Sequence, residues 1–592
     1  MRVMKLSRKL CAILLAATAA ASATACGPQK EEVNDAVTNV YVQIYDGGYG
    51  YGWLENIAAD FESEYKDYQN PVNGKTGVKI IVDPVSETGE NVFASITAQD
   101  HDIVFTEQVD NYMDFVESGY LLDITDILTE NIAGQDHSIA DAMDEYLRDY
   151  YKVNDKYYGL SYGSGFYSLF YDEGLFYNEG FLLKREADAN DPDEIVALTD
   201  SDFIARVADT ERVGKAYAVI VTDGDKSYYK TVSGDYLSMG PDGQYGTYDD
   251  GLPRTYNEFF ALVKYMSEAS VVPFDYIGVD GGGCYVPCFL AQLCADYEGY
   301  DQTLVNYTFD GIKDNLIKVT DGTIEKLPSV TLVPDNSNGN AAETYKSAGK
   351  YYALDFYSKM MTGRGRYVGR NLKNKRTQFD AQSDFIKSKY STINKTAFLL
   401  DGTWWMNESS VTFNSLSKND DRYKPENRDF KMLALPKADK TKTGAGEKVT
   451  YLDVNYLTAM VLKKTSADKV ELAKKFLQYC FTDKANKKFT VETQIPRPYS
   501  YDLGDDYSRL TPYGQNLWDV LKNQSRTVYP VSQSEHFKLK GVYYNSKQMF
   551  TTRIARTNYT GLDVLFRTGK SVYTAETVYN GLYDYFLTVL GG

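Results

Sequence analysis

The sequence is poor in histidine and has fewer basic than acidic residues. Its 592 residues include only 3 His, and 63 Lys and Arg stand against 82 Asp and Glu, for a formal net charge of -19. So few imidazoles leave little material for a catalytic triad or a His-rich metal site. Because phosphate backbones repel a chain this acidic, we expect no nucleic-acid partner.

Two common ligand motifs are also missing. Cys284, Cys288 and Cys294 lack the spacing of a zinc site and have no nearby His. The apolar neighbours of Cys288 and Cys294 predict buried thiols, and one disulfide is the alternative outside the cell. The glycine run at Gly281–Gly283 lacks the Lys-Ser/Thr pair of a phosphate-binding loop. We therefore expect no zinc site, no phosphate loop and no required cofactor.

The N-terminal apolar run is too short to cross a membrane. Leu10–Ala21 is shorter than the about 20 apolar residues that a membrane span needs. Together with the basic segment before it, this run is typical of a secretory signal. Small residues then precede Cys26, which resembles the lipobox of bacterial lipoproteins. The resemblance implies a signal peptide at residues 1–25, a diacylated Cys26 and a lipid anchor on the extracellular face of the bacterial cell membrane. Plain signal cleavage is the alternative. Residues 26–39 are polar, and we expect them to form a flexible tether.

The region after the tether alternates strand and helix patterns. Val40–Tyr45, Val78–Val82 and Asp102–Phe105 are predicted as strands, and apolar residues between Trp53 and Phe61 recur at helical spacing. This alternation favours an α/β sheet with crossover helices. Ligands of such sheets bind beyond the carboxyl ends of the strands, here after Tyr45 and Phe105.

Several segments, in this order, resemble the carbohydrate-type extracellular solute-binding proteins of ABC importers, the group that includes maltose-binding proteins. They are IYDGG at 44–48, DIVF at 102–105, GYLLDIT at 119–125, LFYD at 169–172, PRTYNEF at 253–259 and AFLLDGTWW at 397–405. The resemblance implies two α/β lobes of the type II periplasmic-binding-protein fold, joined by a hinge. We expect residues 40–165 plus 452–506 in lobe one and 166–451 plus 507–592 in lobe two.

The resemblance also implies a sugar site between the lobes. A sugar site needs aromatic platforms for C–H faces and polar groups for hydroxyls. Trp404 and Trp405 are the candidate platforms, with core packing as the alternative. The candidate hydroxyl partners are Tyr45, Asp46, Glu107 and Asp110 at strand ends, Tyr162 and Tyr167 on the first hinge crossing, and Asp453 and Asn455 on the return crossing. Turn or cap chemistry is the alternative for Asp46 and Asp110.

An acidic, glycine-rich loop at 240–250 suggests a cation site. Asp242, Asp249 and Asp250 offer hard oxygen ligands of the kind that calcium prefers. The loop resembles the calcium loop that some oligosaccharide-binding relatives carry just before the PRTYNEF segment. An acidic turn without metal is the alternative.

We weigh three functions on these grounds. The ordered segments favour a monomeric, non-enzymatic protein that binds a carbohydrate, preferably an oligosaccharide, and presents it to ABC transporter permease subunits. A secreted glycoside hydrolase stays open, because such an enzyme needs only two carboxylates about 5–10 Å apart. A binding protein for a peptide or another polar solute is the third possibility, since the fold does not fix the ligand.

Overall fold

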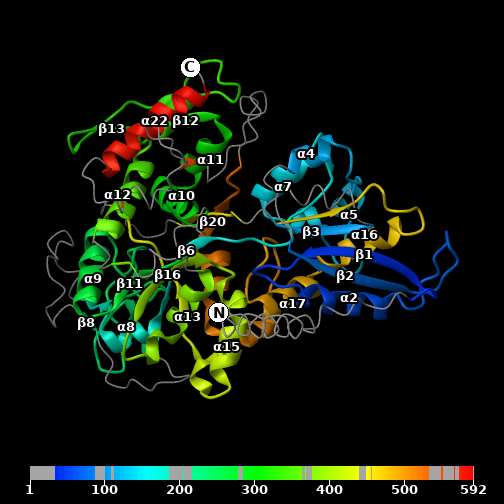
Figure 1. Ribbon diagram of the computed structural model, residues 1–592, viewed down its shortest axis with the longest axis horizontal. Coiled ribbons are helices and arrows are strands. Elements are labelled where there is room, and N and C mark those ends of the chain that lie inside the picture. The colour runs from blue at the N-terminus through cyan, green and yellow to red at the C-terminus, as the bar shows by residue number, and fades with distance from the viewer. Residues whose placement is uncertain are drawn as a thin grey trace, which may run out of the picture.

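The computed structural model describes residues 34–86, 100–107, 112–185, 204–205, 217–277, 284–362, 367–368, 377–438, 448–454, 457–531, 549–550, 566 and 573–590. These residues form two α/β lobes, each built around a four-stranded sheet (Figure 1). In Figure 1 the lobe that contains the first strand lies on the right.

The first sheet has the order β2-β1-β3-β19. Its strands are β1 (Thr38–Tyr45), β2 (Val78–Val85), β3 (Ile103–Thr106) and β19 (Thr458–Val461). Strand β1 is parallel to β2 and β3, whereas β19, which comes from much later in the chain, is antiparallel to β3. The predicted first strand forms because Val40, Val42 and Ile44 are β-branched and fully buried on one face.

Helices that come from both ends of the chain cover this sheet. Helix α2 (Gly52–Glu64) packs on β2 and against α16 (Val470–Tyr479) and α17 (Asp483–Thr493). The helical spacing predicted between Trp53 and Phe61 is the buried face of α2. The rim of the lobe holds α4 (Tyr112–Glu117), α5 (Thr125–Thr129), α6 (Ile139–Ala142), α7 (Glu145–Tyr151), β4 (Lys152–Val153) and β5 (Lys156–Tyr157).

The second sheet has the order β11-β16-β6-β17. Its strands are β6 (Tyr167–Asp172), β11 (Val272–Asp275), β16 (Thr396–Gly402) and β17 (Phe430–Met432). Strand β16 is parallel to β11 and antiparallel to β6. Every residue of β6 and β16 is buried, as expected for central strands that are covered on both faces.

Helices cover both faces of the second sheet and enlarge the lobe around it. They are α8 (Glu173–Glu179), α9 (Tyr256–Glu268), α10 (Tyr285–Glu298), α12 (Ala348–Thr362), α13 (Gln378–Lys387), α14 (Trp405–Glu408), α15 (Ser410–Ser417) and α18 (Pro512–Trp518). Short helical turns are η3 (Ala341–Lys346), η5 (Ser388–Tyr390), η6 (Asp421–Tyr423), η7 (Pro425–Asn427), η9 (Gly504–Arg509) and η10 (Asp519–Asn523). Helix α18, after residue 506, packs on β17.

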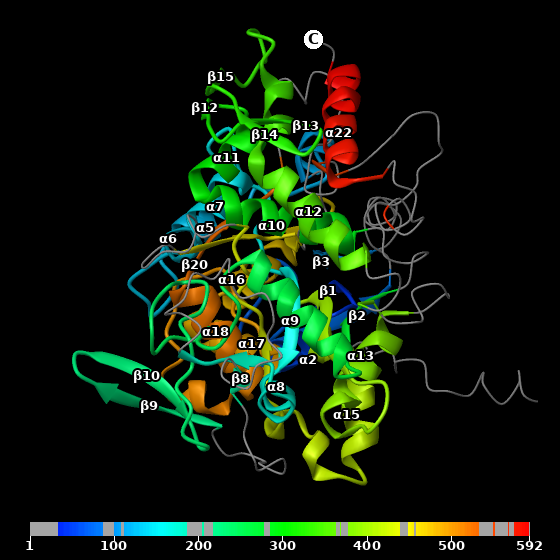
Figure 2. The ribbon, with the colours of Figure 1, turned by 90° about the vertical axis from the view of Figure 1, so that its left-hand side faces the viewer.

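Short strands and helices lie at two ends of this lobe (Figure 2). The hairpin of β9 (Ala218–Asp223) and β10 (Lys226–Thr231) projects at one edge, near β7 (Leu182–Leu183) and β8 (Ile204–Ala205). At the other end lie α11 (Tyr300–Thr308), β12 (Gly311–Lys313), β13 (Ile317–Thr320), β14 (Thr323–Lys326), β15 (Val330–Leu332) and α22 (Ala575–Leu590). Helix α22 packs on η3 and α12.

Three chain segments meet where the lobes join. Strand β18 (Val449–Leu452) runs parallel to β20 (Ser525–Val528), and the Val454 amide donates to the Gly165 carbonyl oxygen at 2.9 Å. The Asp453 carboxylate accepts from the Gly165 amide at 3.1 Å and from the Tyr146 hydroxyl at 3.2 Å. We use the name hinge ladder for β18, β20 and the residues bonded beside them, Gly165, Asp453 and Val454.

Two further observations concern cysteines and membranes. Cys284, Cys288, Cys294 and Cys480 form no disulfide, and all but Cys284 are buried. Within the described ranges, no helix has both the length and the apolar character needed to cross a bilayer.

Candidate functional site

Strand ends from both lobes meet at one place. Tyr45 and Asp46 follow β1, and Glu107 follows β3, in the first lobe. Burial raises the pKa of Tyr45 to about 12, and the negative charges of Glu107, of Glu408 from the second lobe and of Asp46 add to this effect. Such mutual influence requires close approach. The first lobe therefore presents a tyrosine and two carboxylates to the second.

Trp404 lies at the centre of this junction. Its ring meets the Tyr167 ring edge-on at 5.2 Å between centroids and lies 6.3 Å from the Tyr49 ring. Glycines allow this approach: a Cβ on Gly48, from the first lobe, or on Gly402 would lie under 3.0 Å from ring atoms of Trp404. The indole is consequently held between backbone of both lobes and is 7% exposed.

A group of carboxyls surrounds the indole. The Gln382 amide nitrogen donates to Asp401 Oδ2 at 3.0 Å and to Glu408 Oε2 at 2.8 Å, and the indole of Trp404 also donates to Glu408. Ser409 Oγ donates to Gln382 Oε1 at 2.8 Å, which fixes the amide orientation. Because Gln382 can donate to both acids at once, it holds the two carboxyls in one arrangement.

Burial makes these carboxyls weak acids. Burial, and next the charge of Glu408, raises the pKa of Glu107 and of Asp401 well above the ordinary range. Burial also raises the pKa of Glu408 itself. Protonated and ionised carboxyls side by side offer both donors and acceptors. The arrangement is suited to a ligand with many hydroxyl groups.

The electrostatic environment of the site is acidic. Within the described ranges, no Lys or Arg is among the charges that shift the pKa of Tyr45, Glu107, Asp401 or Glu408. An anionic ligand would meet unfavourable charge here. The site is therefore suited to a ligand that is neutral or cationic.

The structure separates the candidates that the sequence grouped together. Tyr45, Asp46, Glu107, Tyr167 and Trp404 lie around this junction. Asp110 and Asn455, like Cys26, fall outside the described residues.

Three candidates have structural roles instead. Trp405 is fully buried among core rings, including those of Phe385 and Phe430, so it has no face for a ligand. Tyr162 is 1% exposed and stacks on Trp53 in the core of the first lobe. Asp453 is used by the hinge ladder, since both of its carboxylate oxygens accept hydrogen bonds within the protein.

Sequence reasoning missed other members of the site. Asp401 stands in the apolar run of β16, where a buried acid needs a reason, so the sequence did carry a signal for it. Tyr285, at the start of α10, lies 5.0 Å from the Tyr167 ring, and burial and the charges of Asp401 and Glu408 raise its pKa. Gln382 lies on an ordinary amphipathic helix and gave no signal.

The acidic loop bonds mainly to itself. Asp249 Oδ2 accepts from the Asp242 amide at 2.9 Å, and the Asp250 carboxylate accepts from the amides of Gly246 and Thr247. Burial, with the nearby charge of Asp242, raises the pKa of Asp249 to about 7. Among the residues with described positions, no group of three or more His, Cys, Asp or Glu is arranged to hold a metal ion. Calcium binding here stays a prediction.

The architecture is the two-lobed α/β fold that the sequence predicted. The solved structure of apo RafE from Streptococcus pneumoniae matches with a TM-score of 0.50 and 14% identity, covering 94% of this chain and 100% of that chain. The two sheets, the hinge ladder and this likeness agree on the fold.

Two other solved structures are similar at a slightly lower level. One is described as SBP RafE in complex with raffinose (TM-score 0.48, 14% identity, 93% of this chain and 100% of that chain). The other is described as a chitin oligosaccharide binding protein (TM-score 0.49, 12% identity, 94% of this chain and 100% of that chain). No family model matches the sequence, and no curated protein matches it.

Proposed function

We propose that this protein is a non-enzymatic solute-binding protein for a carbohydrate, preferably an oligosaccharide. The observation that carries the proposal is the meeting of Trp404 with carboxyls from both lobes. An indole suits the C–H face of a sugar, and the carboxyls suit its hydroxyls. Because the two lobes each supply part of the site, a bound sugar would favour the closed arrangement of the lobes.

The proposal extends to the cellular setting. The lipobox at Cys26 supports a diacylated protein anchored on the extracellular face of a bacterial membrane. There a monomer would deliver its sugar to the permease subunits of an ABC importer. Globomycin-sensitive processing and metabolic labelling with an alkyne fatty acid test the anchor, and a C26A variant that still carries the label contradicts it.

A screen of the protein against glycans tests the binding function. A bound sugar raises the melting temperature by mass action, and W404A should lose that rise. F379A is the matched control, because Phe379 is an exposed aromatic, 51% accessible, outside the junction. A panel in which peptides raise the melting temperature and sugars do not would favour the peptide-binding alternative.

The cluster of Glu107, Asp401 and Glu408 keeps one enzymatic alternative open. A glycoside hydrolase needs one carboxyl with a raised pKa as general acid and a second, ionised carboxylate beside it, and this cluster contains carboxyls with raised pKa values next to a sugar platform. Incubation of each bound glycan with the protein should release no reducing ends. Product release that disappears in E107Q would replace the binding proposal with an enzymatic one.

The proposed function requires no cofactor. Calcium at Asp242, Asp249 and Asp250 is an optional addition, which would use their carboxylates in place of some loop hydrogen bonds. Calorimetric titration with Ca²⁺ tests it, with D249A as the variant that should bind less. An absence of heat from the parent protein would exclude calcium binding at this loop.

A further inference from the structure

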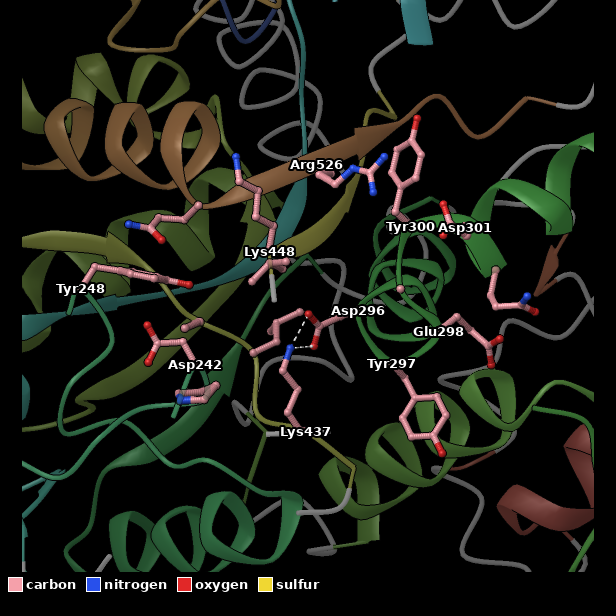
Figure 3. A pocket seen from close by; sticks show the side chains of 17 residues that line it. Asp242, Tyr248, Asp296, Tyr297, Glu298, Tyr300, Asp301, Lys437, Lys448 and Arg526 are labelled. Carbon is pink, nitrogen blue, oxygen red and sulfur yellow. Dashed lines mark hydrogen bonds and ion pairs between the residues drawn. The ribbon is translucent and has the colours of Figure 1, made fainter. Parts of the chain in front are cut away.

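A cavity of about 420 Å³ lies beside the hinge ladder (Figure 3). Trp404 is not among the residues that line it. Its walls come from β18 and β20, from the end of α10, from the start of α11, and from residues 241–248 and 434–437. Helix α10 separates the two places: Tyr285 at its start lies at the Trp404 junction, and Asp296 and Glu298 near its end line the cavity. At about 1.5 Å per residue, the separation is roughly 17–20 Å.

Two cations reach this cavity from the hinge ladder. Thr450 pairs with Arg526 across β18 and β20. Because alternate residues of a strand share a face, Lys448 lies on the same face as Arg526. In the part of the chain that the structure describes, no ion pair within 4.0 Å involves either side chain. The ladder therefore presents two positive charges to the cavity without a paired carboxylate.

The third cation of the cavity is already neutralised. Lys437 Nζ donates to both carboxylate oxygens of Asp296 at 2.6 Å, and Figure 3 shows this pair at the side of the cavity away from Arg526. The guanidinium of Arg526 stacks on the Tyr300 ring at 3.6 Å from its centroid and also hydrogen-bonds to Tyr300. A guanidinium has five N–H donors, so donors remain for an anion. The anionic part of a ligand is thus directed to the Arg526 side.

The opposite wall offers groups for hydroxyls. Tyr248 and Asp242 line it, and Figure 3 shows the Tyr248 hydroxyl pointing toward the Asp296–Lys437 side. Burial, with the charge of Asp249, raises the pKa of Tyr248 well above its ordinary range, so its hydroxyl stays protonated and can donate. The cavity volume falls within the about 300–1,000 Å³ of small-molecule sites.

We propose that this hinge cavity is a second binding site, for a small hydroxylated anion such as a sugar acid or a sugar phosphate. Lys448 and Arg526 bind the carboxylate or phosphate, and Tyr248 and Asp242 bind hydroxyl groups. The proposed ligand differs in charge from the one that suits the Trp404 junction, where acids predominate. The inference therefore does not depend on the proposed function.

Calorimetry on the full chain tests the site with four probes: glucuronate, glucose 6-phosphate, inorganic phosphate and glucose. Glucuronate or glucose 6-phosphate should bind saturably, and binding by one but not the other would identify the anionic group. K448Q and R526Q should each weaken that binding about tenfold or more, because each removes a charge-assisted hydrogen bond. Any binding of glucose should not depend on either residue.

Two controls distinguish binding in the cavity from binding elsewhere on the protein. K418Q removes an exposed lysine at the end of α15 and should leave anion affinity unchanged, and W404A should also leave it unchanged. Loss of anion binding in W404A would place the anion at the junction and overturn the proposal. The proposal would also be overturned if K448Q and R526Q bound both hydroxylated anions as tightly as the parent protein does. Binding of inorganic phosphate as tight as that of the hydroxylated anions would overturn it as well.

Discussion

At the scale of single residues, the glycine opposite Trp404 is a restrictive position. A Cβ on Gly48 would lie under 3.0 Å from Cδ1, Cγ and Cβ of Trp404, so the whole indole would have to move. We predict that G48A weakens glycan binding at least tenfold and lowers the unfolding free energy by about 1–3 kcal/mol, the usual effect of overpacking. Calorimetry and urea unfolding measure the two effects.

The chain offers a matched control for this substitution. Gly52, four residues later in the first turn of α2, has no heavy atom within 4 Å of the place that a Cβ would take, so G52A adds a methyl group in open space. G52A should bind as the parent protein does. Similar affinities of G48A and G52A would contradict the close contact between Gly48 and the indole.

Single residues also set the limit of what the sequence can predict. Trp404 and Trp405 are adjacent and chemically identical, yet one lies at the junction and the other in the core. The turn after β16 decides between them, and its backbone course depends on contacts with Phe166 and Tyr513 from distant segments. Asp401 stands out in the sequence as an acid within an apolar run, whereas Gln382 became recognisable only once α13 was packed against β16.

At the scale of elements, local sequence patterns predicted those strands and helices whose formation depends on neighbouring residues. β1 follows from its run of β-branched and aromatic residues, and α2 follows from the helical spacing of its buried residues. Strand β19 could not be assigned to the first sheet in this way, because its partner β3 lies about 350 residues earlier. Likewise, the bonds of Asp453 in the hinge ladder depend on residues far away in the sequence.

The hinge ladder permits a graded test. D453A leaves the buried Gly165 amide and the Tyr146 hydroxyl without their acceptor, and we predict a loss of about 2–4 kcal/mol in unfolding free energy. D453N keeps one acceptor and adds a donor that the Tyr146 hydroxyl can accept, so it should lose less than half as much. Equal losses in the two variants would show that the carboxylate bonds are not the cause.

The acidic loop at 240–250 should make stability depend on pH. Because the pKa of Asp249 is raised to about 7, the folded loop holds a proton that the unfolded chain releases above about pH 4. Folding therefore binds protons in this window, and stability falls as the pH rises from about 4 to 7. D249N carries no titrating group, so its melting temperature should decline less over the same window.

D310N is the control for this prediction. Asp310 is an exposed carboxylate in another part of the lobe. Thermal unfolding between pH 4 and pH 8 should give parallel curves for D310N and the parent protein. A D249N curve parallel to both would contradict the raised pKa of Asp249.

At the scale of the whole molecule, the first lobe is assembled from distant parts of the chain. β19, α16 and α17, within residues 458–493, complete a sheet that begins at Thr38. We predict that a fragment of residues 34–166 alone lacks a cooperative thermal transition, because its β3 edge and the faces under α16 and α17 are uncovered. Circular dichroism measures this. Adding a second fragment, 457–511, should restore the transition.

This interleaving of the chain also determines the order of events when the protein is made. A polypeptide that emerges from its N-terminus exposes the first three strands of the sheet long before the fourth has been synthesised. The interval is the translation of about 350 residues, which at about 5–20 residues per second takes roughly 18–70 seconds. The nascent first lobe thus stays incomplete while these residues are translated, a period in which chaperones can engage it before the fourth strand arrives.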